Sequence, residues 1–169
     1  MLLTLVALII GIALIIKAIR PDILEDLDIR TKPKYGYIKK QYFMTKAENE
    51  LFQILSKEFS GEYVVFAQVH LPTIINHKIK GQNWKAALSS VDRKSVDFVL
   101  CDKTYLSPKL AIELDDKSHE EEDRKERDRF VEQVLESAGM PLLRIKNKGF
   151  FDVAEVVEMV RKGVRDASV

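Results

Sequence analysis

Two short apolar stretches, SVDFVLC at residues 95–101 and KLAIELD at residues 109–115, dominate the centre of the chain. Both are rich in aliphatic and β-branched residues, and the Asp, Thr, Ser and Pro residues between them favour a turn. They therefore predict two neighbouring β-strands joined as a hairpin. Side chains alternate between the faces of a strand, so Glu113 and Asp115 point to the same side, and Asp97 opens the adjacent strand.

The flanking sequence predicts the other elements of the domain. Thr45 and Glu48 have the spacing of a capping box, and the apolar residues after them recur at helical intervals, which predicts a helix over residues 46–59. The further predicted elements are a strand at 63–71, a helix at 120–138, a strand at 142–145 and a helix from 152 to about 164. Residues 72–94 are polar and irregular and indicate a long loop or an insertion.

This order of elements predicts an α/β domain with an αβββαβ core, in which helices flank a central mixed sheet. The helix between the third and fourth strands forms a crossover connection, so those two strands should be parallel. A chain of 169 residues has room for one such domain. Its 27 Lys and Arg residues nearly balance its 26 Asp and Glu residues, so a site for a polyanion would need local clustering of charge.

The first 16 residues, MLLTLVALIIGIALII, carry no charge. Extended to residue 19 they form a helix of about 28 Å, close to the ~30 Å of a bilayer's hydrocarbon core. The sequence thus predicts a transmembrane anchor at residues 1–19, a juxtamembrane linker at 20–43 and a folded domain at 44–169. A cleaved signal peptide and a buried core helix are the alternatives, but no basic residue precedes the run and no polar face interrupts it.

Acidic residues converge at one end of the predicted hairpin. Asp97, Glu113 and Asp115 lie on the strands, and Asp116 and His119 follow directly. Carboxylates this close repel one another unless a cation lies among them, and hard oxygen ligands suit Mg²⁺ or Mn²⁺. Such an ion could polarise a phosphate and activate water for hydrolysis. The alternative is a solvated polar cluster, but the position of Glu113 inside an apolar strand favours the functional interpretation.

Four stretches together resemble a known superfamily. They are Val96-Asp97-Phe98, the run AIELDDKSH at residues 111–119, Arg127-Asp128 and Leu142-Leu143-Arg144. The series resembles the PD-(D/E)XK nucleases, which have a restriction-endonuclease-like fold, and among them the branch around very-short-patch-repair endonucleases. Closer still, it resembles the bacterial domain-of-unknown-function family numbered twenty-seven twenty-six, whose members are often preceded by a membrane segment. The resemblance covers roughly residues 43–160.

The resemblance implies roles for particular residues. Asp97 and Glu113 match the metal-binding acidic residues of the second and third core strands. The superfamily places a lysine two residues after that glutamate, where this sequence has Asp115. Lys117 or His119 would then substitute for the missing lysine, or Asp115 would be an extra metal ligand. The predicted catalytic residues are Asp97, Glu113, Asp115 and His119, and the first three are the predicted ligands of Mg²⁺ or Mn²⁺.

Other residues are candidates for binding or support. Glu48 matches an acidic residue of the superfamily's first helix, and its place in the capping box explains it equally well. Arg127 continues the apolar stripe of its helix and could clamp a phosphate or the acidic cluster, although a solvated helix start also accounts for it. The predicted substrate-binding residues are Arg127, Arg144 and Lys117. Trp84, in a loop with several lysines, could stack on nucleic acid, but one aromatic residue does not establish that role.

Two functions follow from these features. The first is a membrane-tethered nuclease that depends on a divalent metal and acts on nucleic acid, DNA more than RNA. The second is a catalytically inactive relative that binds nucleic acid or a protein partner at the membrane. Lys and Arg residues cluster after the apolar run, and the positive-inside rule places such a flank in the cytoplasm. The predicted location is therefore the bacterial inner membrane, with a single span and a cytoplasmic domain.

Overall fold

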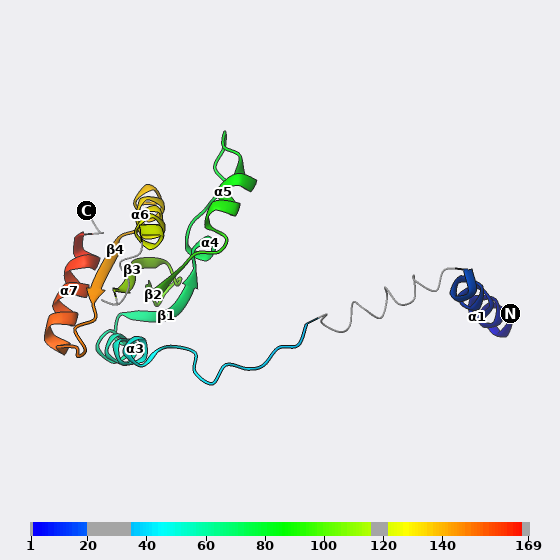
Figure 1. Ribbon diagram of the computed structural model, residues 1–169, viewed down its shortest axis with the longest axis horizontal. Coiled ribbons are helices and arrows are strands. Elements are labelled where there is room, and N and C mark those ends of the chain that lie inside the picture. The colour runs from blue at the N-terminus through cyan, green and yellow to red at the C-terminus, as the bar shows by residue number, and fades with distance from the viewer. Residues whose placement is uncertain (1, 20–34, 116–121, 167–169) are drawn as a thin grey trace. The chain divides into compact units, whose positions relative to one another are not determined.

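The structure, a computed structural model, describes residues 2–19, 35–115 and 122–166. The chain divides into two compact units, Met1–Phe43 and Met44–Val169. The second unit contains α3 (Lys46–Glu58), β1 (Tyr63–His70), α4 (Leu71–Ile74), α5 (Trp84–Val91), β2 (Ser95–Asp102), β3 (Pro108–Asp115), α6 (Glu122–Ser137), β4 (Leu142–Lys146) and α7 (Val153–Asp166) (Figure 1). It is a mixed α/β domain.

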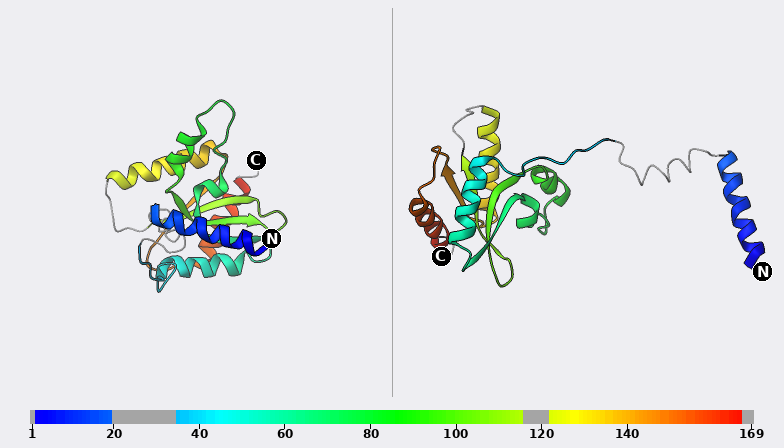
Figure 2. Two further views of the ribbon diagram at one scale, coloured as in Figure 1. Left: turned by 90° about the vertical axis from the view of Figure 1, so that its right-hand side faces the viewer. Right: turned by 90° about the horizontal axis from the view of Figure 1, so that it is seen from below.

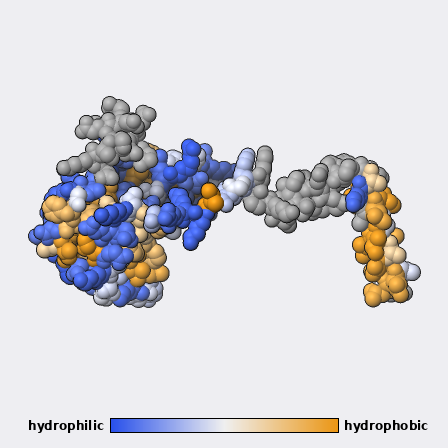
Figure 3. All heavy atoms as spheres, turned by 60° about the horizontal axis from the view of Figure 1, so that its bottom comes forward, coloured by the Kyte–Doolittle hydropathy of each residue, from blue (hydrophilic) through white to orange (hydrophobic). Residues whose placement is uncertain are grey.

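In its described residues, the first unit contains the helix α1 (Leu2–Ile19), whose surface in Figure 3 is mostly hydrophobic. In the part of the chain that the structure describes, no helix is both long and apolar enough to cross a membrane. Because α1 has 18 residues with Lys17 in its last turn, it measures only about 27 Å, less than the ~30 Å hydrocarbon core. The predictions of a transmembrane helix at residues 1–19 and of a single-pass inner-membrane location are therefore wrong.

The four strands form one mixed sheet in the order β1-β2-β3-β4. β2 pairs antiparallel with both β1 and β3, whereas β3 and β4 are parallel. The parallel pair follows from the crossover through α6, as the sequence predicts. Gly139 ends that crossover helix in the left-handed conformation, with φ of 67°, which glycine adopts without steric cost. The register between β2 and β3 places Phe98 opposite Ile112, and both side chains are fully buried.

Each face of the sheet is covered by helices and has its own hydrophobic core (Figures 1 and 2). On one face, α3 and α7 pack through Leu51, Leu55, Val156 and Val160 against alternate residues of the strands, among them Phe98. On the other face, α6 contributes Val131 and Leu135, and the ends of the segment between β1 and β2 contribute Leu71 and Val91. We name these the first core and the second core.

The segment between β1 and β2 is more regular than the sequence indicates. Residues 72–94 were expected to be a loop or an insertion, but α4 and α5 lie there. α4 has a proline in its first turn, and the side chain of Asn83 caps α5 by accepting a hydrogen bond from the backbone N–H of Ala86. These helices have four and eight residues, too short for hydrophobic periodicity to reveal them.

The capping box predicted at the start of α3 is present. The backbone N–H of Glu48 donates to the Thr45 hydroxyl at 3.2 Å, and the backbone N–H of Thr45 donates to Glu48 Oε2 at 2.6 Å. These bonds satisfy donors that the first turn of a helix otherwise leaves unpaired. They also set the position of the Glu48 side chain relative to the sheet.

We expect Thr45→Ala to lower the free energy of unfolding of the domain by about 1 kcal/mol, because the helix loses its N-cap hydroxyl. Urea denaturation followed by circular dichroism measures the change. Ser60→Ala is the matched control. Ser60 lies just beyond the C-terminal end of α3, where its hydroxyl donates to the Lys57 carbonyl, and the substitution should lower the free energy of unfolding by less than about 0.5 kcal/mol. Equal losses in the two variants would show that the capping box contributes nothing.

Candidate functional site

A row of four polar side chains crosses the sheet, one from each strand. Ala67 pairs with Phe98 and Val69 with Val96, so Gln68 of β1 lies opposite Asp97 of β2. The pair Phe98 and Ile112 likewise brings Asp97 opposite Glu113 of β3, which in turn pairs with Arg144 of β4. Neighbours on adjacent strands have Cβ atoms only about 5 Å apart, so these four side chains can interact directly. We call them the polar row.

Gln68 has an unusual backbone conformation for a residue in the middle of a strand. Its φ is 52°, in the left-handed region that residues other than glycine rarely adopt. Ala67 packs against the first core and Val69 against the second, although strict alternation would put both on one face. The left-handed residue between them accounts for the switch. Strain of this kind in a strand often marks a functional site.

The amide of Gln68 connects α3 to the polar row. Its Nε2 donates to Glu48 Oε1 at 2.9 Å and lies 3.5 Å from Asp97 Oδ1. The second oxygen of Glu48 accepts the capping hydrogen bond of α3. Glu48 therefore fulfils its capping role and, through the same carboxylate, lies beside the acidic residues of the site. The two interpretations that the sequence left open are compatible in the structure.

Asp97 and Glu113 form the centre of the row. Both are half-buried, and they lie opposite each other on adjacent strands, close enough that the charge of Asp97 raises the pKa of Glu113. One oxygen of Asp97, Oδ2, accepts the backbone N–H of Leu114 at 2.8 Å. This bond ties the Asp97 side chain to the backbone of β3 and keeps it against Glu113.

The environment favours the protonated form of both carboxyls. Burial raises the pKa of Glu113 to about 8, and the charge of Asp97 adds to this effect, whereas Arg144 opposes it. Burial also raises the pKa of Asp97, with a contribution from the charge of Glu48, although the Leu114 N–H acts in the opposite direction. Two acids that cannot both ionise easily are poised to take up a cation or to hold a proton near neutral pH.

Asp115 and Arg144 form an ion pair next to the carboxyl pair. Arg144 Nη1 donates to Asp115 Oδ1 at 2.8 Å, and both side chains are about one-third exposed. Although burial acts against it, the pKa of Arg144 is raised overall, because Asp115 hydrogen-bonds to the guanidinium and further carboxylates surround it. Asp115 was predicted to bind metal and Arg144 to bind substrate. In the structure, these two side chains form an ion pair with each other.

Three other predicted site residues cannot be placed. Lys117 and His119 lie outside the described residues. Arg127 belongs to α6, but its side chain is not among those described. The predicted roles of these three residues therefore stay predictions.

The structure adds two residues that the sequence did not single out as site residues. Gln68 is the only amide in the otherwise mostly apolar strand YVVFAQVH, and a polar residue inside such a run was a signal that could have identified it. Asp128 of α6 acts electrostatically on both Glu113 and Arg144. Its position could not be inferred from sequence, because it depends on how the crossover helix packs over the sheet.

The arrangement fits a hydrated magnesium-type ion better than a protein cage. Among the residues that the structure describes, no group of three or more His, Cys, Asp and Glu side chains is arranged to hold a metal ion. Mg²⁺ commonly keeps several of its waters and is held by only one or two carboxylates. Asp97 and Glu113 supply two hard oxygen ligands whose mutual repulsion a cation would relieve.

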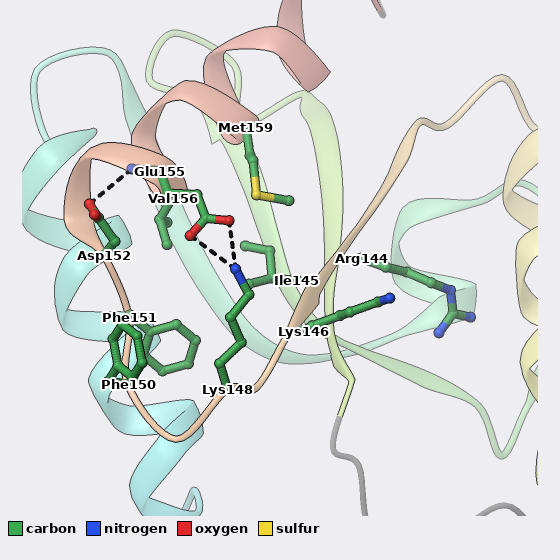
Figure 4. Close-up of a pocket in the computed structure, with 10 residues that line it drawn as sticks. All are labelled: Arg144, Ile145, Lys146, Lys148, Phe150, Phe151, Asp152, Glu155, Val156 and Met159. Atoms are coloured by element: carbon green, nitrogen blue, oxygen red, sulfur yellow. Dashed lines mark hydrogen bonds and ion pairs between the residues drawn. The ribbon is translucent and has the colours of Figure 1, made fainter.

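Two hollows in the domain lie next to the site but do not contain the carboxyl pair. The first, of about 200 Å³, lies beside α7, where Lys148 Nζ is 2.8 Å from Glu155 Oε1. Arg144 lines it in part, but Figure 4 shows that the Arg144 side chain extends away from the hollow. A second hollow, of about 440 Å³, runs along β1 and α4 and reaches Gln68.

We expect the metal-free domain to become less stable as the pH rises from about 5 to 8. The pKa of Glu113 is raised in the folded state from 4.5 to about 8, so in this range the folded protein binds more protons than the unfolded one and stability falls. Urea denaturation in EDTA at several pH values measures the trend. Glu113→Gln should flatten it, whereas Glu132→Gln, an exposed change on α6, should not. An unchanged slope in Glu113→Gln would contradict the assignment.

The chain matches a protein family over residues 40–163, which is more than half of its length and includes the whole polar row. The family is described as "Protein of unknown function (DUF2726)". No curated protein and no solved structure gives a match. The chain belongs to the DUF2726 family.

Proposed function

We propose that this protein is a nuclease-like phosphodiesterase of the restriction-endonuclease type, which depends on Mg²⁺ or Mn²⁺ and acts on nucleic acid, DNA more than RNA. The observation that carries the proposal is the pair of Asp97 and Glu113, half-buried and opposite each other on adjacent strands, with the pKa of Glu113 raised to about 8. A like-charged pair in such a place costs stability, and a divalent cation would offset that cost.

The roles of the individual residues follow from their contacts. Asp97 and Glu113 would hold the ion, and the Leu114 N–H and the Gln68 amide would orient Asp97. A bound divalent ion would supply a polarised phosphate and a more acidic water. Arg144 lies beside the pair, and its guanidinium could exchange Asp115 for a phosphate, because the ion pair is partly exposed and a guanidinium also binds phosphate oxygens well.

The attacking water needs a group that accepts or orients its proton. Asp115 stands where the resembled nucleases have lysine, and its carboxylate is paired with Arg144. His119 is our candidate to accept or orient the proton of the attacking water, because an imidazole with a pKa of ~6.5 is largely neutral near pH 7.5.

An inactive relative that binds nucleic acid or a protein partner is the second candidate. The ion pair of Asp115 with Arg144 favours this second function. Asp115 occupies the sequence position of the missing lysine, and its carboxylate is bound to Arg144 at 2.8 Å. The carboxyl pair argues against this function, since a binding module gains nothing from two half-buried acids whose pKa values are both raised.

We expect Mn²⁺ to raise the melting temperature of the protein, and to raise it more at pH 8 than at pH 6. The metal competes with the proton that Glu113 holds below about pH 8, so binding releases a proton and strengthens with pH. Differential scanning fluorimetry with and without Mn²⁺ measures the shift.

Asp97→Asn and Glu113→Gln should each abolish this shift, because each removes one ligand charge while keeping the shape of the side chain. Glu132→Gln, exposed on α6, is the matched control and should respond like the unaltered protein. If both site variants kept the full response to Mn²⁺, the metal assignment would be refuted.

We expect His119→Ala to lower cleavage of a DNA substrate by about 10²-fold, the usual loss when a general acid or base is removed. The Mn²⁺-induced shift in melting temperature should remain, because His119 is not among the predicted metal ligands. Lys57→Gln, exposed on α3, should cleave normally. If the unaltered protein cleaved neither DNA nor RNA, single- or double-stranded, with either metal, the inactive binding module would be the correct function.

A further inference from the structure

The insertion between β1 and β2 carries a basic surface around the only tryptophan of the chain. Residues 72–94 contain five Lys and Arg residues and one Asp, a net charge of +4, whereas the net charge of the whole chain is +1. Three of the lysines, Lys78, Lys80 and Lys85, lie within seven positions of Trp84. We name the outer part of this segment, residues 76–86, the tip.

The base of the insertion is firmly attached to the domain. Leu71 and Val91 are buried in the second core, and the backbone N–H of Leu71 donates to the carbonyl of Lys94 at 2.9 Å, which joins the two ends. The ammonium of Lys94 lies 5.1 Å from the centre of the Phe130 ring of α6. The tip therefore projects from a fixed base, and in Figure 1 it extends away from the sheet beyond α5.

The tip has internal structure of its own. The side chain of Gln82 donates to the carbonyl of His77 at 2.6 Å, and the backbone N–H of Lys78 donates to Asn76 Oδ1 at 2.9 Å. Asn83 caps the helix α5, which begins at Trp84. These contacts order the backbone of the tip, while the side chains of Lys78, Lys80, Trp84 and Lys85 are exposed.

Trp84 is exposed beside two lysines. The residue is 45% exposed, so solvent and a ligand can reach its ring. The ammonium groups of Lys78 and Lys85 lie 5.8 Å and 5.6 Å from the ring centre. Within the described parts of the chain, none of the three tip lysines is in an ion pair with a carboxylate. The structure thus places an exposed aromatic ring beside two ammonium groups that no carboxylate of the described residues pairs with.

We propose that the tip binds a single-stranded segment of nucleic acid, with a base stacked on Trp84 and the adjoining phosphates on Lys78, Lys80 and Lys85. Stacking on an exposed aromatic ring requires an unpaired base, and the positive charge around the ring matches the backbone that such a base carries. An acidic peptide would satisfy the lysines but has no planar group for the ring. A duplex would offer its phosphates, but its bases are already stacked on one another.

The position of the tip is consistent with a role in delivering substrate to the polar row. Ala111 and Leu142 pack in the second core, and Glu113 and Arg144 follow each of them by two positions, so they face the same side of the sheet. The insertion covers that side as well. The inference that the tip binds the substrate of the carboxyl pair rests on the proposed function. The binding of a single strand to the tip can be measured without cleavage.

Trp84 is the only tryptophan in the chain, so tryptophan emission excited selectively over the tyrosines reports on the tip. The full-length Glu113→Gln variant in EDTA is titrated with a 12-nucleotide oligothymidine, under conditions that allow neither metal binding nor cleavage. We expect saturable quenching of tryptophan emission. The same dissociation constant should appear in the anisotropy of a fluorescein-labelled oligonucleotide.

Tip variants separate stacking from charge. Trp84→Ala should weaken binding in the anisotropy assay by about tenfold, within the range measured for a stacked base, and Trp84→Phe should restore most of the loss. The double variant Lys78→Gln and Lys85→Gln should reduce the slope of log K against log salt by about 1.4, because each lost phosphate contact on a single strand contributes about 0.7. Lys57→Gln, on the exposed surface of α3, is the matched control and should leave the slope unchanged.

Several outcomes would overturn the proposal. They are binding of the oligonucleotide without quenching, equal affinity for a duplex of the same length, and equal quenching by polyglutamate. If the Trp84→Ala variant cleaved single-stranded DNA with an unchanged KM, the tip would not be the binding site, but the proposed nuclease function would still hold. Binding with the expected quenching in a protein that shows no Mn²⁺ response and no cleavage would support the tip and reject the nuclease.

Discussion

The antiparallel pairing of β2 with β3 is the constraint on which the site and the core both depend. It places Phe98 against Ile112 in the first core, and one position further along it brings Asp97 opposite Glu113. A shift of the register by one residue would take the apolar side chains out of the first core and turn the acidic ones into it. The hydrophobic effect therefore holds the two carboxyls together, since separating them would require the core to open.

The surroundings of the carboxyl pair reduce the free-energy cost of ionising two half-buried acids, but they do not remove that cost. A backbone N–H, the Gln68 amide and the Arg144 guanidinium each favour one negative charge, yet burial still raises the pKa of Glu113 to about 8. The left-handed backbone of Gln68 is a second local cost, and it aims the amide between Glu48 and Asp97. A site that retains both costs is better explained by function than by stability, which a hydrophobic pair would serve better.

The two faces of the sheet differ in what they contribute. The face covered by α3 and α7 is a packed core whose central side chains are fully buried, and it supplies the rigid support of the strands. The opposite face has smaller core residues, the crossover helix with Asp128 and the insertion that ends in the tip. The carboxyl pair and the tip thus lie on the same side of the sheet, and the packed core on the other side maintains the register that brings the two carboxyls together.

Local patterns in the sequence determined most of the elements of this protein. The four strands, the helix with its capping box and the parallel crossover depend on alternation, caps and connection length, which neighbouring residues encode. The same patterns could not show that an apolar N-terminal run ends as a helix of 18 residues, nor that two short helices interrupt the insertion. Tertiary structure alone decided which polar groups meet: that Asp115 pairs with Arg144, and that Gln68 reaches Asp97. Those contacts join residues 29 positions apart in sequence, and only the lateral packing of strands brings such residues within the few ångströms that a hydrogen bond requires.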